Sequence, residues 1–212
     1  MAKGKQILLK SSYNDDPNII EIGLDEAGRG ALAGPVTVAA VIMPHDFQHP
    51  LIKDSKLLNE KERQEAREIV LKHALASVVY HIGVDEIESM NILKATMKGM
   101  HDCLVHLDDR ATRFDFILVD GDQFHGFAGI PFETVVGGDN KYTSIAAASI
   151  LAKTSRDELM KELSDEFPEY GWGSNKGYGS AQHRNAIQET GGCVHHRPSF
   201  ISHMVTKTAS LF

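Results

Sequence analysis

Residues 22–30 read Ile-Gly-Leu-Asp-Glu-Ala-Gly-Arg-Gly, and an apolar run over residues 36–43 follows them. This pattern predicts a β-strand that ends at two adjacent carboxylates, Asp25 and Glu26, and turns at glycines into a second strand. Asp and Glu are disfavoured in strands, and neighbouring anions raise each other's pKa unless a cation lies between them. A divalent metal ion is the simplest such cation. Because glycine backbone can approach a ligand closely and Arg29 suits a phosphate, the stretch indicates metal-assisted chemistry on a phosphate ester.

Two further acids stand at the ends of apolar segments elsewhere in the chain. Asp120 ends the segment that begins at Phe114, and Asp139 follows Val135-Val-Gly-Gly. A single Asp-Glu pair beside glycines is as typical of a solvated turn as of a site, but three such strand ends are harder to explain in that way. In open α/β sheets, ligands bind beyond the carboxyl ends of parallel strands, where acids that are distant in sequence converge. The sequence therefore predicts one acidic site.

Apolar periodicity predicts one sheet flanked by helices. The expected strands are 19–24, 36–43, 77–84, 114–119 and 132–136. The expected helices are about 60–76, 85–107 in two pieces broken near Asn91, 142–167, and about 181–190. Asn59-Glu-Lys-Glu62 resembles a capping box for the first helix, and Pro168 ends the long one. Residues 145–152 are rich in small side chains all round, which predicts close packing in the interior.

Composition favours a compact enzyme of a reducing compartment. With 212 residues, of which 42% are hydrophobic and 24% charged, the chain can bury a full core. We expect no membrane span and no secretory signal, because no apolar run has the required length. Cys103 and Cys193 show neither metal-ligand spacing nor a disulfide framework, so we expect a cytoplasmic protein.

The net charge of −7 argues against indiscriminate nucleic-acid binding, because Lys and Arg normally supply that affinity through counterion release. Several basic residues nevertheless lie close in sequence to the acids, and we expect them to form a basic track on an acidic body. They are Lys53, Lys56, Lys141, Lys153, Arg156, Lys176, Arg184 and Arg197. The alternative is a set of scattered, solvated charges.

Six motifs occur in an order that resembles one enzyme family. They are Asp25-Glu-Ala-Gly-Arg-Gly30, Asp54-Ser-Lys56, Leu118-Val-Asp-Gly121, Gly138-Asp139 with Ser144 through Lys153, Gly177-Tyr-Gly-Ser180, and His196-Arg197 through Phe200. Each motif alone is weak, but together they are similar to ribonuclease HII. The resemblance implies the ribonuclease H-like α/β fold, a mixed five-stranded sheet flanked by helices, with the first and fourth strands adjacent and parallel. It also implies a catalytic core over residues 1–168 and a helical C-terminal extension over 169–212 that forms one wall of a substrate groove within the same compact unit.

The same resemblance implies a metal-dependent endoribonuclease. Such an enzyme cuts the RNA strand of RNA:DNA hybrids and ribonucleotides embedded in DNA, and it leaves 3′-hydroxyl and 5′-phosphate ends. The expected catalytic residues and metal ligands are Asp25, Glu26, Asp120 and Asp139. Carboxylate oxygens suit two Mg²⁺ or Mn²⁺ ions, whereas zinc would favour His or Cys. A neighbouring pair such as His195 and His196 rarely chelates one ion, so we expect a structural or phosphate-contacting role for it.

The 2′-hydroxyl that separates ribose from deoxyribose is both a donor and an acceptor, and backbone groups can meet both needs. The resemblance implies that Gly28-Arg29-Gly30, here called the glycine turn, makes these contacts. It also implies that Tyr178 packs on the neighbouring sugar. The expected substrate-binding residues are Gly28, Arg29, Gly30, Lys53, Lys56, Tyr178 and Arg197. The alternative for Tyr178 is a loop aromatic that covers Trp172 or the C-terminal helices.

Two other functions stay open at this point. One is a ribonuclease HIII-type enzyme, which usually carries an additional N-terminal substrate-binding domain, whereas here the first acids lie close to residue 1. The other is a catalytically silent nucleic-acid-binding module of the same fold, although all four acids are intact.

The C-terminal end suggests a protein partner. Ser210, Leu211 and Phe212 are similar to the short tails with which bacterial replication proteins dock into sliding clamps, although Thr208 stands where a glutamine is expected. The alternative is a frayed end or a helix end packed on the body. We expect a monomer and no membrane partner.

Overall fold

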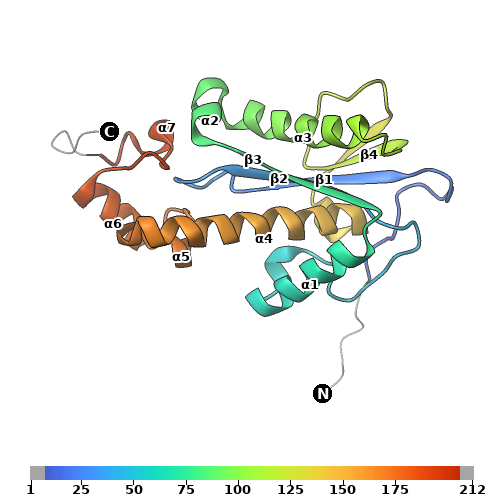
Figure 1. The fold of residues 1–212 in the computed structure, drawn as a ribbon, viewed down its shortest axis with the longest axis horizontal. Helices are drawn as coiled ribbons and strands as arrows, with labels where there is room; N and C mark the ends of the chain where they lie inside the picture. The colour runs from blue at the N-terminus through green and yellow to red at the C-terminus, as the bar shows by residue number, and fades with distance from the viewer. Residues whose placement is uncertain (1–7, 206–212) are drawn as a thin grey trace, which may run out of the picture.

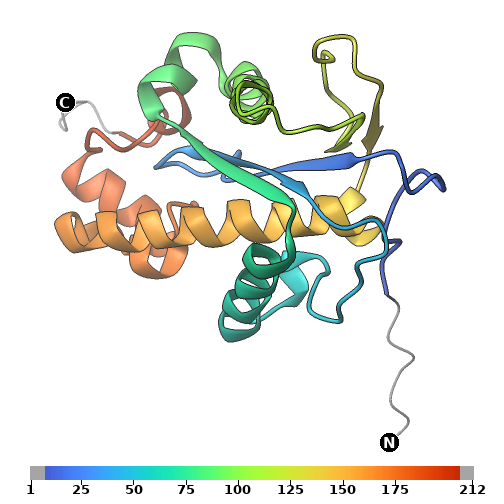
Figure 2. The same cartoon turned by 45° about the vertical axis from the view of Figure 1, so that its right-hand side comes forward.

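The sheet is mixed, and helices cover both of its faces. A computed structural model describes residues 8–205. The sheet lies between two layers of helices (Figures 1 and 2). Five strands lie in the order β3-β2-β1-β4-β5. They are β1 (Glu21–Ala27), β2 (Val36–Ile42), β3 (Ala76–Ile82), β4 (Phe116–Asp120) and β5 (Phe132–Val135). β1 pairs antiparallel with β2 and parallel with β4, which confirms the topology that the resemblance implied.

The central strand β1 is longer than predicted. The strand expected to end at Leu24 continues through Asp25 and Glu26 to Ala27. Asp25 lies opposite Ala39 of β2, and this pairing supplies ladder hydrogen bonds that outweigh the poor strand propensity of the acids. The two carboxylates therefore lie on a paired strand and not in the turn after it, so their backbone is fixed on one side by β2.

The helices follow the predicted pattern, with short additions near the C-terminus. The α-helices are α1 (Glu60–His73), α2 (Val84–Met90), α3 (Ile92–Asp109), α4 (Thr143–Glu166), α5 (Trp172–Asn175), α6 (Ala181–Thr190) and α7 (Pro198–Ile201). The 3-10 helices are η1 (Ser55–Leu57), η2 (Gly138–Asn140) and η3 (Pro168–Tyr170). The capping box at Asn59 is present, and Asn91, with φ of 75°, separates α2 from α3 as predicted. α2 and α3 lie on one face of the sheet, and α1 and α4 lie on the other (Figure 1).

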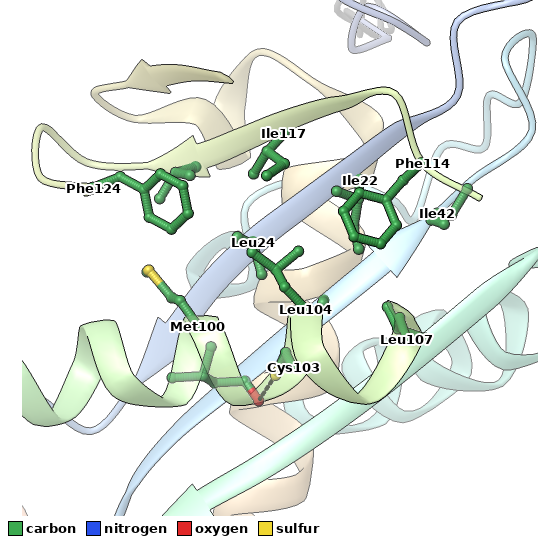
Figure 3. Packing of buried hydrophobic residues seen from close by; sticks show 13 residues of the cluster. Ile22, Leu24, Ile42, Met100, Cys103, Leu104, Leu107, Phe114, Ile117 and Phe124 are labelled. Carbon is green, nitrogen blue, oxygen red and sulfur yellow. Dashed lines mark hydrogen bonds between the residues drawn. The ribbon is translucent and has the colours of Figure 1, made fainter. Parts of the chain in front are cut away.

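One apolar core lies between the sheet and α3. Ile22 and Leu24 of β1 meet Ile117 of β4 and the inner face of α3 (Figure 3). Because alternate side chains of a strand face opposite sides of the sheet, this orientation places Glu26 on the α3 side and Asp25 on the α4 side.

A second core lies between the sheet and α4. Residues 145–152 of α4 are buried, as their small side chains predicted. A Cβ added to Gly23 of β1 would lie 2.3 Å from the carbonyl carbon of Ser144, so the helix approaches the strand at this point as closely as only glycine permits. α4 is thereby fixed directly over the acidic end of β1.

The C-terminal segments pack around Trp172 at the far end of α4 (Figure 1). Met160 of α4 and Leu32 and Ala33 of the loop after β1 belong to the same apolar cluster. The division at residue 168 stays a prediction, and these contacts join the segment after it to α4 and to the loop between β1 and β2. Between residues 8 and 205, no helix combines the length and the apolar character that crossing a membrane requires.

Candidate active site

The four predicted acids gather where β1 and β4 end. The parallel register of these strands places Asp25 and Asp120 side by side. Glu26 follows on β1, and Asp139 enters from η2, directly before α4. Asp120 accepts a hydrogen bond of 2.7 Å from the Gly138 N–H, which ties η2 to the end of β4. Acids that are distant in sequence are thus brought together by the sheet.

A cavity of about 400 Å³ opens between the acids, the glycine turn and Tyr178. Its lining residues are Asp25, Glu26, Ala27, Gly28, Arg29, Gly30, Ser55, Lys56, Asp120, Ser149, Lys153 and Tyr178. Most of the predicted catalytic and substrate-binding residues therefore share one cavity, whereas Asp139, Lys53 and Arg197 do not line it. Asp139 is linked to the cavity through Lys56, whose Nζ is 3.5 Å from Asp139 Oδ2.

Burial and repulsion from neighbouring carboxylates disfavour the charged form of Asp25, Glu26 and Asp139. Asp25 is 4% exposed, and burial together with the carboxylates of Glu26 and Asp120 raises its pKa well above the ordinary value. Burial raises the pKa of Glu26, and burial and Asp120 raise the pKa of Asp139. A cation in the cavity would offset both the cost of burying these carboxylates and the repulsion between them.

Asp139 is held in place by its neighbours. The amide of Asn140 donates to Asp139 Oδ1 at 3.1 Å and to Asp54 Oδ2 at 3.3 Å. Asp54 also accepts the Lys56 N–H at 2.8 Å. The Asp54-Ser-Lys56 motif is therefore bonded to the acid cluster. The sequence did not identify Asn140 as a residue of the site. The one feature that could have indicated it is its position directly after Asp139.

Ser149 is a second residue that the sequence did not single out. Its hydroxyl lies 3.2 Å from that of Ser55, and hydrogen bonding from Ser149 opposes the rise in the pKa of Asp25. Both serines are buried. Ser149 meets Asp25 because α4 packs on β1, and this contact between distant segments leaves no local signal in the sequence.

The donor set suits hard divalent cations that are held partly by water and substrate. All four acids offer carboxylate oxygens. Glu26 lies on the α3 side of the sheet, whereas Asp25 and Asp120 lie on the α4 side. Accordingly, no three His, Cys, Asp or Glu side chains between residues 8 and 205 form a ready-made metal group. This open arrangement fits Mg²⁺ or Mn²⁺ bound by few carboxylates together with substrate phosphate, and not an all-protein cage.

The predicted basic track is only partly correct. Lys56 and Lys153 line the cavity, and Arg29 is half-exposed there with its guanidinium 3.2 Å from Glu26 Oε1. Arg156 and Arg197 are fully buried, and their guanidinium groups donate to backbone carbonyls. Their assignment to a surface track was wrong, and so was the direct substrate contact predicted for Arg197, because no face of its guanidinium is open to a ligand.

Of the two roles predicted for His196, structural or phosphate-contacting, the structure shows the structural one, because its side chain is buried. The Tyr178 carbonyl can only accept, so His183 Nδ1 donates to it at 3.0 Å. His183 Nε2 then accepts from Trp172 Nε1 and from His196 Nε2, each at 3.0 Å. His196 Nδ1 in turn accepts the Cys193 N–H at 3.0 Å, so each ring has one accepting nitrogen and both imidazoles are neutral. Burial accordingly lowers the pKa of His196 to about 3. The pair fixes the backbone of Tyr178.

Tyr178 faces the cavity and does not cover Trp172. Its side chain is partly exposed, and its ring lies 5.3 Å from the Arg156 guanidinium. Trp172 is instead enclosed by Tyr170, which stacks on it, and by the neighbouring histidines. Tyr178 is therefore available to a ligand that also touches the glycine turn.

Comparisons with known proteins identify the family. A family profile described as Ribonuclease HII matches residues 22–203. Ribonuclease HII of Porphyromonas gingivalis is 48% identical over 91% of this chain and 94% of its own length. Ribonuclease HII of Bacteroides thetaiotaomicron is 49% identical over 86% of this chain and 90% of its own length.

Solved structures share the fold. The ribonuclease HII of Archaeoglobus fulgidus, solved in complex with PCNA, superposes with a TM-score of 0.70 at 23% identity and covers 91% of this chain and 98% of its own. A mutant of Bst-RNase HIII superposes with a TM-score of 0.72 at 20% identity. The match covers 92% of this chain and 71% of the Bst-RNase HIII chain. The fold alone does not separate the two types, but the profile and the sequence relatives do. The chain therefore belongs to the ribonuclease HII family of endoribonucleases, which degrade RNA in RNA:DNA hybrids.

Proposed function

We propose that this enzyme also cuts at single ribonucleotides embedded in duplex DNA and leaves 3′-hydroxyl and 5′-phosphate ends. The observation that carries the proposal is the shared cavity, which is lined by carboxylates, by the glycine turn and by Tyr178. A scissile phosphate beside the acids would thus have its ribose within reach of backbone groups. The neighbouring sugar would lie against an aromatic ring.

We assign the carboxylates as the holders of two Mg²⁺ or Mn²⁺ ions. Asp25 and Asp120, which lie side by side, are the primary ligands, and Glu26 and Asp139 complete the two shells. Bound ions would supply a nucleophile at neutral pH and would stabilise charge on the entering and leaving oxygens. Glu26 and Asp139 orient the attacking water, and no side chain forms a covalent intermediate.

The remaining residues bind the nucleic acid. Gly28 and Gly30 offer backbone to the 2′-hydroxyl, and Arg29, whose side chain is 51% exposed, binds a phosphate. Tyr178 packs on the sugar next to the ribonucleotide. Lys53 and Lys56 are proposed as further phosphate contacts, and the side chain of Lys56 is 78% exposed beside the cavity.

The test is a cleavage assay on a duplex with one embedded ribonucleotide, with the same duplex made entirely of DNA as its control. We expect a single cut with Mn²⁺ or Mg²⁺, mapped 3′-hydroxyl and 5′-phosphate ends, and no cut after chelation. Cleavage in chelator, or cyclic phosphate ends, would contradict the mechanism. Binding of the duplex without cleavage would instead identify a silent binding module.

We also propose a cytoplasmic monomer that docks on a sliding clamp. Both cysteines are free thiols, which suits a reducing compartment. The clamp residues Ser210, Leu211 and Phe212 lie outside the described residues, so this proposal rests on the sequence of the tail. The A. fulgidus neighbour was solved with PCNA, which shows clamp binding for that protein. Deletion of Leu211 and Phe212 should abolish clamp pull-down, and unchanged binding would remove the idea.

A further inference from the structure

Two fully buried arginines lie beneath the glycine turn, and the proposed mechanism uses neither of them. The guanidinium of Arg197 donates to Gly28 O at 2.8 Å, to Arg29 O at 2.9 Å, and to Gly34 O at 2.9 and 3.0 Å. All of these acceptors are backbone carbonyls of one short loop. Arg197 therefore fixes the orientation of the peptide groups in that loop.

This orientation determines where the N–H groups of the turn point. No peptide bond between residues 8 and 205 is cis, and in a trans peptide the carbonyl and the following N–H point in opposite directions. The carbonyls of Gly28 and Arg29 point at Arg197, so the N–H groups of Arg29 and Gly30 point away from it. Among the described residues neither N–H has a hydrogen-bond partner, and both residues line the cavity.

Arg156 joins the glycine turn to Tyr178, which lines the same cavity. Its guanidinium donates to the carbonyls of Ala33, Pro35 and Lys176 and lies 5.3 Å from the Tyr178 ring. A Cβ on Gly28 would lie 2.1 Å from Arg156 Nε, so the turn rests directly on this side chain. The buried guanidinium of Arg156 thus contacts both the glycine turn and Tyr178 and holds them in a fixed arrangement.

We propose that Arg197 is a positioning residue for ribose specificity. By holding the carbonyls of Gly28 and Arg29, it presents two N–H donors to the oxygen of a 2′-hydroxyl. A deoxyribose would leave these donors without an acceptor, and an unpaired buried donor is costly. The inference rests on the proposed function and gives Arg197 a role that acts through the backbone and not by touching the substrate.

The test measures discrimination and not activity alone. In an Asp120→Asn background that prevents cleavage, the dissociation constant is measured for an all-DNA duplex and for the same duplex with one ribonucleotide. In Arg197→Lys, one ammonium replaces a guanidinium that spans three carbonyls, and we expect the ratio of the two constants to fall about tenfold. The affinity for the all-DNA duplex should stay within about twofold. The matched control is Arg113→Lys, at an exposed arginine that pairs with Asp115, and its ratio should not change.

Two further measurements test the role of Arg197 if Arg197→Lys unfolds or if its ratio of dissociation constants does not give a clear result. Millimolar guanidinium should restore the discrimination of Arg197→Ala, whereas the neutral analogue urea should not. In the unaltered protein, the backbone amide NMR signals of Arg29 and Gly30 should shift with the ribonucleotide duplex and not with the all-DNA duplex. Equal loss of affinity for both duplexes in a folded variant, or equal amide shifts with both, would overturn the proposal. The cleavage assay of the parent, run in parallel, shows separately whether the proposed function itself has failed.

Discussion

Asp120 combines a structural hydrogen bond with the negative charge that the proposed mechanism requires. Its Oδ1 accepts the Gly138 N–H at 2.7 Å, and an asparagine would keep that acceptor while losing the negative charge. We therefore expect Asp120→Asn to unfold within about 1 kcal/mol of the parent and to lose more than about a hundredfold in kcat. Thermal unfolding, the cleavage assay and calorimetric titration with Mn²⁺ measure these effects. The exposed Asp109→Asn is the matched control, and near-parent turnover by Asp120→Asn would overturn the assignment of this acid.

Tyr178 allows a separate test of how the sugar beside the ribonucleotide is recognised. Removing the ring should lower kcat/KM on a single embedded ribonucleotide by about tenfold and affect continuous RNA:DNA hybrids less, because a sugar without a 2′-hydroxyl packs best on the ring. Tyr178→Phe keeps the ring over Arg156 and should behave like the parent. If Tyr178→Ala cuts the embedded ribonucleotide as well as the parent, the tyrosine is only a loop aromatic.

At the residue scale, the sequence predicted the acids that gather at the cavity better than the residues that support them. Asp25 and Asp120 could be found because apolar runs that end in acids are local patterns. Arg197 could not be placed, because whether an arginine faces solvent or backbone carbonyls depends on the packing of distant loops. Ser149 was missed for the same reason, since its partner Asp25 lies on another element.

At the scale of elements, the contact between α4 and β1 positions the site. Alanine at Gly23 would place its Cβ 2.3 Å from the Ser144 backbone and push the helix off the strand. We expect Gly23→Ala to lower the free energy of unfolding by at least about 1–3 kcal/mol, measured by urea denaturation. Gly83→Ala, which meets no atom within 4 Å, should change it by less than about 1 kcal/mol. Equal effects of the two substitutions would contradict close packing at Gly23.

Most elements could be predicted because their signals are local. The capping box at Asn59 and the break at Asn91 are such signals, and the structure confirms both. The extension of β1 to Ala27 could not be predicted, because pairing with β2 overrides the low strand propensity of Asp25 and Glu26. The short helices α5 and α7 were also not predicted as helices, since packing around Trp172 and not periodicity determines them.

At the scale of the whole molecule, the buried histidine pair makes stability depend on pH. The folded pKa of His196 is lowered to about 3 by burial and by the nearby His183, whereas an unfolded histidine titrates near about 6.5. Between these values the unfolded chain binds a proton that the folded protein does not. The stabilisation by this group is therefore complete above about pH 6.5 and is lost as the pH falls.

We expect this single site to lower the free energy of unfolding by about 1.4 kcal/mol per pH unit between about pH 6 and 4. The measurement is urea unfolding of the parent and of His196→Asn over this pH range. The parent should lose stability more steeply than the variant, because the variant lacks the group that titrates. Parallel pH profiles would show that His196 does not carry the effect.

α4 also determines the spacing between three parts of the molecule that contact it. Ser149 of this helix touches Asp25, Arg156 lies beneath the glycine turn, and Met160 packs in the cluster around Trp172. A helix advances about 1.5 Å and turns about 100° per residue, so inserting one residue between these positions would swing the downstream contacts away from their partners. Loops elsewhere can change length without this effect. The number of residues between Ser149 and Met160 thus determines the distance between the acid cluster at Asp25 and the C-terminal cluster around Trp172.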